Sequence, residues 1–300
     1  MGLLFVLSFS AALLFLGAHR DFLGSNWLLL QRDAKTPLSR QQQQQQWWRL
    51  QEVDFLEEAI PGHCADIIAG DPSVPHSRPF MAALIRGNSF MCGGTLIRRN
   101  WVLTAAHCEI GKGDTVILGV HSLSNPEREK QTFQITNVYM HPKFNRTTME
   151  NDIMVLQLNR NAKLNRFVQT IRLPRTYEDV RAGTQCLVAG WGLTENGREV
   201  SDTLHEVSVT VTDRRICNDK EHYNSKPAVT MNMVCAGGIN NQRNDTCNGD
   251  SGGPLICRGI QRGITSFGEP KKCGYPQFPG VYTRLTKDYV EWVKKETERR

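Results

Sequence analysis

The feature of this 300-residue sequence that most constrains its fold is the stretch Asp245–Cys257, in which a serine follows an aspartate and is flanked by glycines. Such a loop, with a cysteine at each end of it, presents the Ser251 hydroxyl instead of packing it. A serine hydroxyl is a poor nucleophile at its own pKa and needs an adjacent base. The stretch therefore predicts a nucleophile only if a histidine and a buried carboxylate occur elsewhere.

Both groups are present. Thr104–Cys108 supplies His107 beside a cysteine, and Asn151–Leu156 supplies Asp152 at the start of an apolar run. The three motifs, in the order His, Asp, Ser, resemble those of the chymotrypsin-like (trypsin-fold) serine proteases. The resemblance implies that Ser251 attacks the substrate carbonyl, His107 takes and returns the proton, and Asp152 holds the imidazole. It also implies that the backbone N–H groups of Gly249 and Ser251 form the oxyanion hole.

Nine cysteines behind an apolar N-terminus indicate an oxidising compartment and a disulfide framework with one cysteine left over. Sequence alone does not fix the pairing. The resemblance implies four pairs: Cys92 with Cys108, Cys186 with Cys257, Cys217 with Cys235, and Cys247 with Cys273. No Cys-x-x-Cys or Cys/His cluster has zinc spacing, and the Gly119–His121 loop lacks the acidic residue of calcium-binding trypsins. We expect no metal site and no cofactor.

Short apolar runs separated by turn signals predict an all-β fold. In the first half they are 80–85, 95–97, 101–103, 115–118, 133–136 and 153–156. The resemblance implies two six-stranded antiparallel β-barrels, about 67–172 and about 173–300, with the catalytic residues in the crevice between them. The one helix predicted is C-terminal, Asp288–Glu296, with Tyr289, Trp292 and Val293 on the side that we expect to pack against the second barrel.

The N-terminal region has no pattern of a packed fold. Leu3–Ala18 is almost entirely apolar and ends in small residues, which predicts a signal peptide at 1–18 and is short for a membrane span. Residues 19–66 contain the glutamine tract 41–46, which is compositionally typical of disorder. We interpret 19–66 as a leader or pro-segment, or as coding sequence wrongly joined to a protease.

Ordered sequence resumes at Ile67-Ile68-Ala69-Gly70. In the family that it resembles, the mature enzyme begins at such a pair, although Ala69 departs from the usual glycine. The resemblance implies that the freed amine of Ile67 pairs with Asp250, and an uncut chain would leave that buried carboxylate unpaired. Asp66 is neither Lys nor Arg, which argues against a trypsin-like activator. The end of the leader, Cys64-Ala65-Asp66, instead resembles that of the granzymes, in which a dipeptidyl peptidase removes the last two residues, here Ala65-Asp66.

Substrate preference is read from residues around the serine. Asp245 lies six positions before Ser251, where trypsin-like members carry the carboxylate of the specificity pocket, and Gly268 and Gly280 match the two wall glycines. These matches imply cleavage after Arg or Lys. Ser266, Phe267 and Gly268 would pair with the extended substrate as an added strand.

Three segments narrow the resemblance to the granzyme A and granzyme K group: 217–224, 231–237 and 263–268. We therefore expect a secreted, granule-type endopeptidase whose partners are protein substrates, serine protease inhibitors and sulfated proteoglycan, and not nucleic acid. The chain has 36 Lys and Arg against 30 Asp and Glu, and the excess is larger beyond the leader. The stretch 141–144 lacks the cysteine that links granzyme A dimers, which favours a monomer.

Two alternatives remain open at this point. The chain could be a non-catalytic binding protein on a protease scaffold, although such proteins usually lose one of the three catalytic residues. It could also be a digestive or plasma trypsin-like protease, in which case residues 217–237 should fit those groups better than the granzymes.

Overall fold

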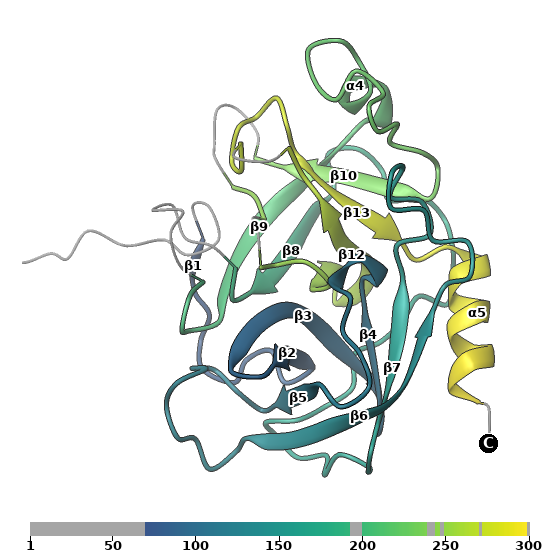
Figure 1. Cartoon of the computed structure of the whole chain (residues 1–300). Helices are drawn as coiled ribbons and strands as arrows, with labels where there is room; N and C mark the ends of the chain where they lie inside the picture. The colour runs from purple at the N-terminus through teal and green to yellow at the C-terminus, as the bar shows by residue number, and fades with distance from the viewer. Residues whose placement is uncertain (1–69, 193–199, 239–243, 247–248, 270–271, 299–300) are drawn as a thin grey trace, which may run out of the picture. The chain divides into compact units, whose positions relative to one another are not determined.

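The computed structural model describes residues 70–192, 200–238, 244–246, 249–269 and 272–298 (Figure 1). All of these residues belong to the compact unit His63–Arg300. The predicted signal peptide, the leader and Ile67 precede residue 70 and lie outside the described residues.

The first half of the described chain forms a closed antiparallel barrel in the order β2-β3-β4-β7-β6-β5. Its strands are β2 (Met81–Arg86), β3 (Ser89–Arg98), β4 (Trp101–Thr104), β5 (Thr115–Leu118), β6 (Gln131–Met140) and β7 (Met154–Leu158). Leu84, Leu96 and Phe133 lie in its core, each at most 1% exposed. All six sequence runs that predicted strands overlap one of these elements, because each buries apolar side chains on the inner face.

The second half forms a sheet in the order β1-β9-β10-β13-β12-β11-β8, which the additional pairing of β8 with β9 closes into a second barrel. Its elements are β1 (Asp71–Pro72), β8 (Gln185–Gly190), β9 (His205–Thr212), β10 (Met233–Gly237), β11 (Pro254–Cys257), β12 (Ile260–Phe267) and β13 (Gly280–Arg284). Six strands close the barrel and β1 adds to β9. The prediction of two six-stranded antiparallel barrels is confirmed.

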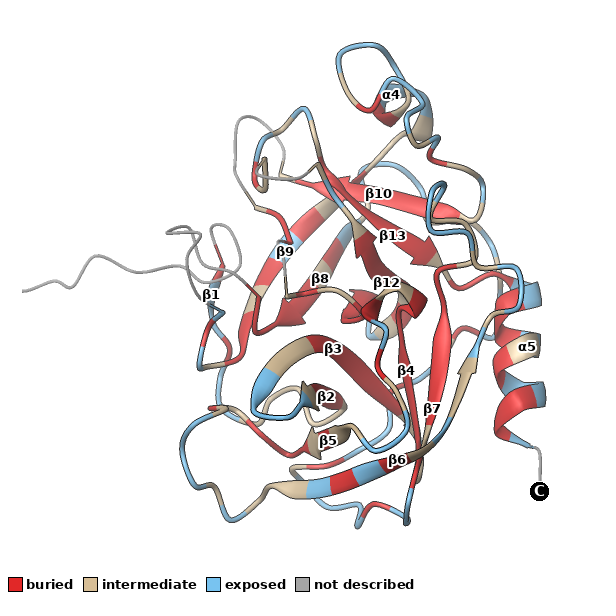
Figure 2. Cartoon of the chain, in the orientation of Figure 1, coloured by how far each residue is buried: buried red, intermediate tan, exposed pale blue. Residues whose placement is uncertain are grey.

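Burial along the strands shows why periodicity alone could not locate all of them. β6 alternates between buried and exposed positions over part of its length, whereas β4 and β11 are buried throughout (Figure 2). A strand covered on both sides is a continuous apolar run, which the sequence does not distinguish from a buried helix by period.

The C-terminal helix α5 (Lys287–Thr297) is present, but the prediction that it packs against the second barrel is wrong. Tyr289, Val290 and Val293 join the core cluster of the first barrel, and α5 lies beside β7. The apolar face of α5 was correctly predicted. Which barrel this face covers depends on the direction that the chain takes after β13, and the sequence does not give that direction. Thr286 caps the helix by accepting a hydrogen bond from the Tyr289 N–H. The only other helices in the described segments are the short η1 (Ala106–Cys108) and α4 (Arg214–Cys217).

Three of the four implied disulfides are formed: Cys92–Cys108, Cys186–Cys257 and Cys217–Cys235. Cys273 is also disulfide-bonded, and its implied partner Cys247 lies outside the described residues. These cross-links close loops around the two barrels, and each typically stabilises a small domain by about 2–4 kcal/mol.

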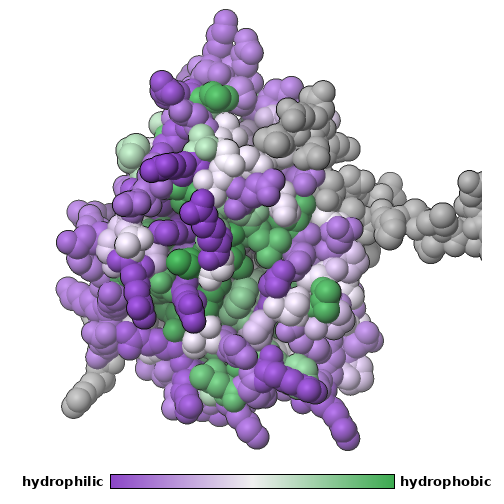
Figure 3. Space-filling model, turned by 180° about the vertical axis from the view of Figure 1, so that it is seen from behind, coloured by the Kyte–Doolittle hydropathy of each residue, from purple (hydrophilic) through white to green (hydrophobic). Residues whose placement is uncertain are grey.

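On the face seen from behind, hydrophilic side chains dominate the margin, and apolar side chains gather toward the centre (Figure 3). A search of the described residues finds no helix both long and apolar enough to cross a membrane.

Candidate active site

His107 and Asp152 form a hydrogen-bonded pair on neighbouring elements of the first barrel. His107 lies in η1, which begins two residues after the end of β4, and Asp152 lies two residues before the start of β7, which pairs with β4. The His107 Nδ1 and Asp152 Oδ2 are 2.7 Å apart, and the His107 backbone N–H donates to Asp152 Oδ1 at 2.9 Å. Asp152 is fully buried, whereas the imidazole is 19% exposed. With Nδ1–H donating to the carboxylate, Nε2 is left as the base.

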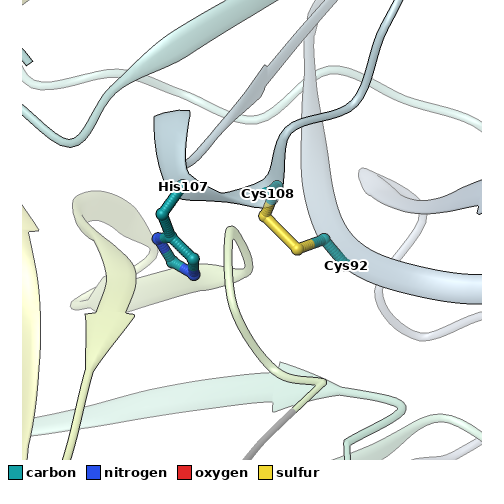
Figure 4. Close-up of side chains that lie close together, drawn as sticks. All are labelled: Cys92, His107 and Cys108. Atoms are coloured by element: carbon teal, nitrogen blue, oxygen red, sulfur yellow. A yellow bond between two sulfur atoms is a disulfide. The ribbon is translucent and has the colours of Figure 1, made fainter. Parts of the chain in front are cut away.

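The Cys92–Cys108 disulfide lies beside His107 and fixes the segment that carries it (Figure 4). The two sulfur atoms and an imidazole nitrogen lie within 4.8 Å of one another, a spacing that would suit a metal ion. The sulfurs are bonded to each other, however, and only a free thiolate is a good metal ligand. This cluster therefore fits a structural cross-link and not a metal centre.

The Ser251 loop of the second barrel is held against the first barrel. The Gly93 N–H donates to the Ser251 carbonyl at 2.9 Å, and Gly93 follows Cys92 in β3. On the other side, the Gly252 N–H donates to Thr265 O at 2.9 Å. Ser251 is half-buried, and its hydroxyl makes no hydrogen bond to any group in the described segments.

Gly252 explains how the loop approaches the histidine segment so closely. Its φ is +78°, and a Cβ at this position would lie 2.1 Å from Thr104 Oγ1 and 2.5 Å from Gly93 O. Thr104 is the last residue of β4, three positions before His107. Only glycine allows this approach, which brings the loop of Ser251 close to the segment that carries His107. A Ser–His hydrogen bond often tightens only when substrate binds.

Two backbone donors lie at the predicted oxyanion hole. Gly249 has a φ of +98°, and neither its N–H nor that of Ser251 donates to another group in the part of the chain that the structure describes. Unused donors beside a nucleophile are what the stabilisation of an oxyanion requires.

Asp250, between these two residues, is buried, at 1% exposed. Its Oδ1 accepts a hydrogen bond from the Gly192 N–H at 2.9 Å. The predicted partner of Asp250, Ile67, lies outside the described residues, so the pair stays a prediction.

Asp245 is buried in the second barrel, 3% exposed. Its carboxylate accepts three backbone hydrogen bonds, from Thr246 at 2.8 Å and from Gly274 and Gly280 at 3.1 Å each. No cationic side chain within the described segments pairs with it. Burial raises the pKa of Asp245 to about 7, while the three N–H donors act in the opposite direction. An unpaired buried carboxylate with this pKa is suited to receive a cation from outside.

The predicted pocket walls differ in how much space they leave. A Cβ on Gly280 would lie 2.9 Å from Asp245 Oδ1, so a larger residue would press on the carboxylate. A Cβ on Gly268 would meet nothing within 4 Å, which indicates open space. Phe267 is half-buried, with its ring centroid 5.8 Å from that of Tyr223. The structure thus gathers these residues around one region of the second barrel.

Ser266 has a contact that the sequence did not indicate. The sequence placed it only among substrate-binding residues, yet its buried hydroxyl donates to Asp152 Oδ2 at 2.5 Å. Thr283 also reaches the same residue, donating to its carbonyl oxygen at 3.0 Å. Both donors come from the second barrel and lie more than 110 positions away in sequence, so no local pattern could have identified them.

Comparisons with known proteins agree with this geometry. A protein-family model described as Trypsin matches residues 67–293. Granzyme A of Bos taurus is 48% identical over 237 residues, which cover 79% of this chain and 90% of that protein. Kallikrein-4 of Homo sapiens is 39% identical over 80% of this chain and 90% of that protein. The solved structure of neuropsin, a serine protease expressed in the limbic system of mouse brain, matches with a TM-score of 0.69 and 38% identity, covering 77% of this chain and 99% of that one.

Proposed function

Because the chain belongs to the trypsin family of serine endopeptidases, we propose that it hydrolyses peptide bonds after Arg or Lys, using Ser251, His107 and Asp152. The observation that carries the proposal is the buried Asp245, which has no cationic partner among the described residues, in the same barrel as Ser251, whose hydroxyl makes no hydrogen bond within them. The first would hold the substrate's basic side chain, and the second would attack its carbonyl carbon.

The proposed reaction follows from the positions of the donors. His107 Nε2 takes the Ser251 proton as Oγ bonds to the carbonyl carbon, and the N–H groups of Gly249 and Ser251 stabilise the oxyanion. His107 then gives that proton to the leaving amine, which leaves an acyl-enzyme. Water, deprotonated by the same nitrogen, releases the acid. Asp152, held by Ser266, keeps Nδ1 protonated throughout.

A fluorophosphonate probe tests this proposal against the non-catalytic alternative. A working catalytic serine reacts covalently with the probe, and a binding protein on the same scaffold does not. We expect the probe to label protein that begins at Ile67 and not to label the same protein with Ser251→Ala. Equal labelling of both proteins, or of neither, would contradict the proposed mechanism.

We expect the binding of benzamidine, a cationic arginine mimic, to weaken as the pH falls through 7. The cation needs an ionised Asp245, and the pKa of this group in the free protein is about 7. From pH 8 to pH 5, proton competition should raise the Kd about 100-fold. Calorimetry on Ser251→Ala measures this without turnover, and a Kd constant to within threefold would mean that Asp245 does not receive the cation.

The same raised pKa affects folding in a defined direction. Between the ordinary aspartate pKa of 3.8 and about 7, the unfolded chain has released the Asp245 proton and the folded chain retains it. This group therefore lowers the free energy of unfolding as the pH rises through that window. A cation bound at Asp245 should offset the loss.

Activation is proposed to follow release of the Ile67 amine. A chain beginning at Ile67 should turn over an arginyl ester, and one extended by Ala65-Asp66 should be nearly inactive, because the Asp250 carboxylate is buried and the extended chain has no free amine at Ile67 to pair with it. Equal activity of the two chains would contradict the proposal. N-terminal sequencing of native material should then find Ile67 first.

Secretion into cytolytic granules is the proposed setting, since the relatives include granzyme A and the mast cell protease 3 of Ovis aries. Protein substrates and serpin-type inhibitors follow from the family. Retention by sulfated proteoglycan and a monomeric state are proposals that rest on the net positive charge and on the cysteine-free 141–144 stretch.

A further inference from the structure

The turn that leads into Asp152 has an unusual backbone. Met149 and Asn151 have φ values of +58° and +60°, in the left-handed region that residues other than glycine rarely adopt. Two such residues stand within three positions of the aspartate that orients His107. Backbone of this kind persists only where surrounding contacts fix it, so the contacts of this turn are informative.

Glu150, between those two residues, ties the turn to the second barrel. Its Oε1 accepts a hydrogen bond from the Thr230 hydroxyl, and its Oε2 accepts one from Asn232 Nδ2 at 3.4 Å. Thr230 Oγ1 in turn accepts from the Asn232 N–H at 3.2 Å. Asn232 directly precedes β10 and Thr230 lies two residues earlier, whereas Glu150 lies between β6 and β7. One carboxylate thus joins elements of two barrels.

The neighbours of Glu150 also make contacts outside the first barrel's strands. The Tyr289 hydroxyl of α5 donates to Asn151 Oδ1 at 3.0 Å, and Thr283 of β13 donates to the Asp152 carbonyl at 3.0 Å. Met149 packs against a core cluster of the second barrel. Burial raises the pKa of Tyr289 above its ordinary value, so this hydroxyl remains a donor. Four consecutive residues are therefore each held from elsewhere, and Glu150 contributes a carboxylate in addition to that of Asp152.

We propose that Glu150 is a positioning residue for catalysis. By accepting hydrogen bonds from Thr230 and Asn232, its carboxylate holds the left-handed turn, and so holds Asp152 at hydrogen-bond distance from His107. This inference rests on the proposed function, since it concerns the same catalytic pair. It adds a role for the Thr230–Asn232 segment, which lies in neither the catalytic motifs nor the specificity pocket.

The test compares kcat, KM and benzamidine affinity for protein beginning at Ile67. Glu150→Ala should lower kcat about 10- to 100-fold, the range that a misplacement of about 1 Å produces. KM and the benzamidine Kd should stay within twofold, because Asp245 has separate hydrogen-bond partners. Glu150→Gln keeps an acceptor for Thr230 but turns an NH₂ group toward Asn232. Its kcat should fall between that of the unmodified protein and that of Glu150→Ala. Glu178→Ala is the matched control, because this exposed carboxylate has no partner among the described residues.

A double-mutant cycle distinguishes a positioning role of the Glu150–Thr230 hydrogen bond from a general loss of stability. Thr230→Val removes the donor with little change of shape, and adding it to Glu150→Ala should lower kcat by no more than a further twofold. Three results would overturn the proposal: kcat retained within twofold in Glu150→Ala, parallel loss of kcat and benzamidine binding, or multiplicative losses in the cycle. Turnover by Ser251→Ala would instead refute the proposed function, so the two failures are distinguishable.

Discussion

Replacing Ser251 by Ala should lower kcat for an arginyl ester about 10⁶-fold, the loss seen when the nucleophile is removed from a Ser–His–Asp protease. The hydroxyl is the only group of the proposed site that forms the covalent bond, so no neighbour can replace it. The residual rate, about 10³–10⁴ above water, should come from the oxyanion donors and substrate binding. Steady-state assays on protein beginning at Ile67 would measure the effect.

The fold should survive this substitution, because the Ser251 hydroxyl makes no hydrogen bond within the described part of the chain. Unchanged thermal unfolding and unchanged benzamidine affinity are the controls. Ser225→Ala is a matched serine substitution away from the site, since Ser225 is exposed and its hydroxyl donates only to Asn218 O at 3.3 Å. A Ser251→Ala protein that retains one-tenth of the activity would rule out the proposed nucleophile.

Replacing Asp245 by Ser should lower kcat/KM for Arg and Lys substrates about 30- to 5,000-fold. The lower and upper figures correspond to about 2 and 5 kcal/mol for the loss of one partner from a buried charge pair. The neutral residue would leave the substrate cation without a counter-charge at a position where the carboxylate is buried. Cleavage after apolar residues should change little or increase, so the ratio of the two activities is the most direct measurement.

Asp245→Asn provides the matched control, because it keeps the side chain's size and an acceptor for the Gly280 N–H but removes the charge. It should lose Arg and Lys cleavage about as much as Asp245→Ser. Both variants should still react with a fluorophosphonate, since Ser251 and His107 are untouched. If either variant keeps Arg and Lys cleavage within threefold, the specificity pocket has been misidentified.

The sequence predicted the fold class and the local motifs because these are written in short stretches. The glycines next to Ser251 and the apolar run after Asp152 lie at fixed positions relative to those residues. Each predicted strand likewise corresponds to a short apolar run in the sequence. The resemblance then implied two barrels, which the structure confirms. The roles of the predicted site residues remain predictions, although the structure brings His107 and Asp152 within 2.7 Å of each other.

The remaining features depend on contacts between distant parts of the chain. The hydrogen bond from Ser266 to Asp152 spans 114 positions, and the contact of Glu150 with Thr230 spans 80. Neither has a local signature. The same limit explains the error about α5, whose apolar stripe was visible in the sequence although the surface it covers was not.

The position of α5 at the end of the chain determines when the turn before Asp152 can be completed during synthesis. Tyr289 of α5 bonds to Asn151 beside Asp152, and a ribosome extends the chain from the N-terminus. A nascent chain therefore cannot complete this support until nearly its last residue has been synthesised. Ribosome-bound fragments that already carry all three predicted catalytic motifs should therefore hold Asp152 less firmly than the released chain does.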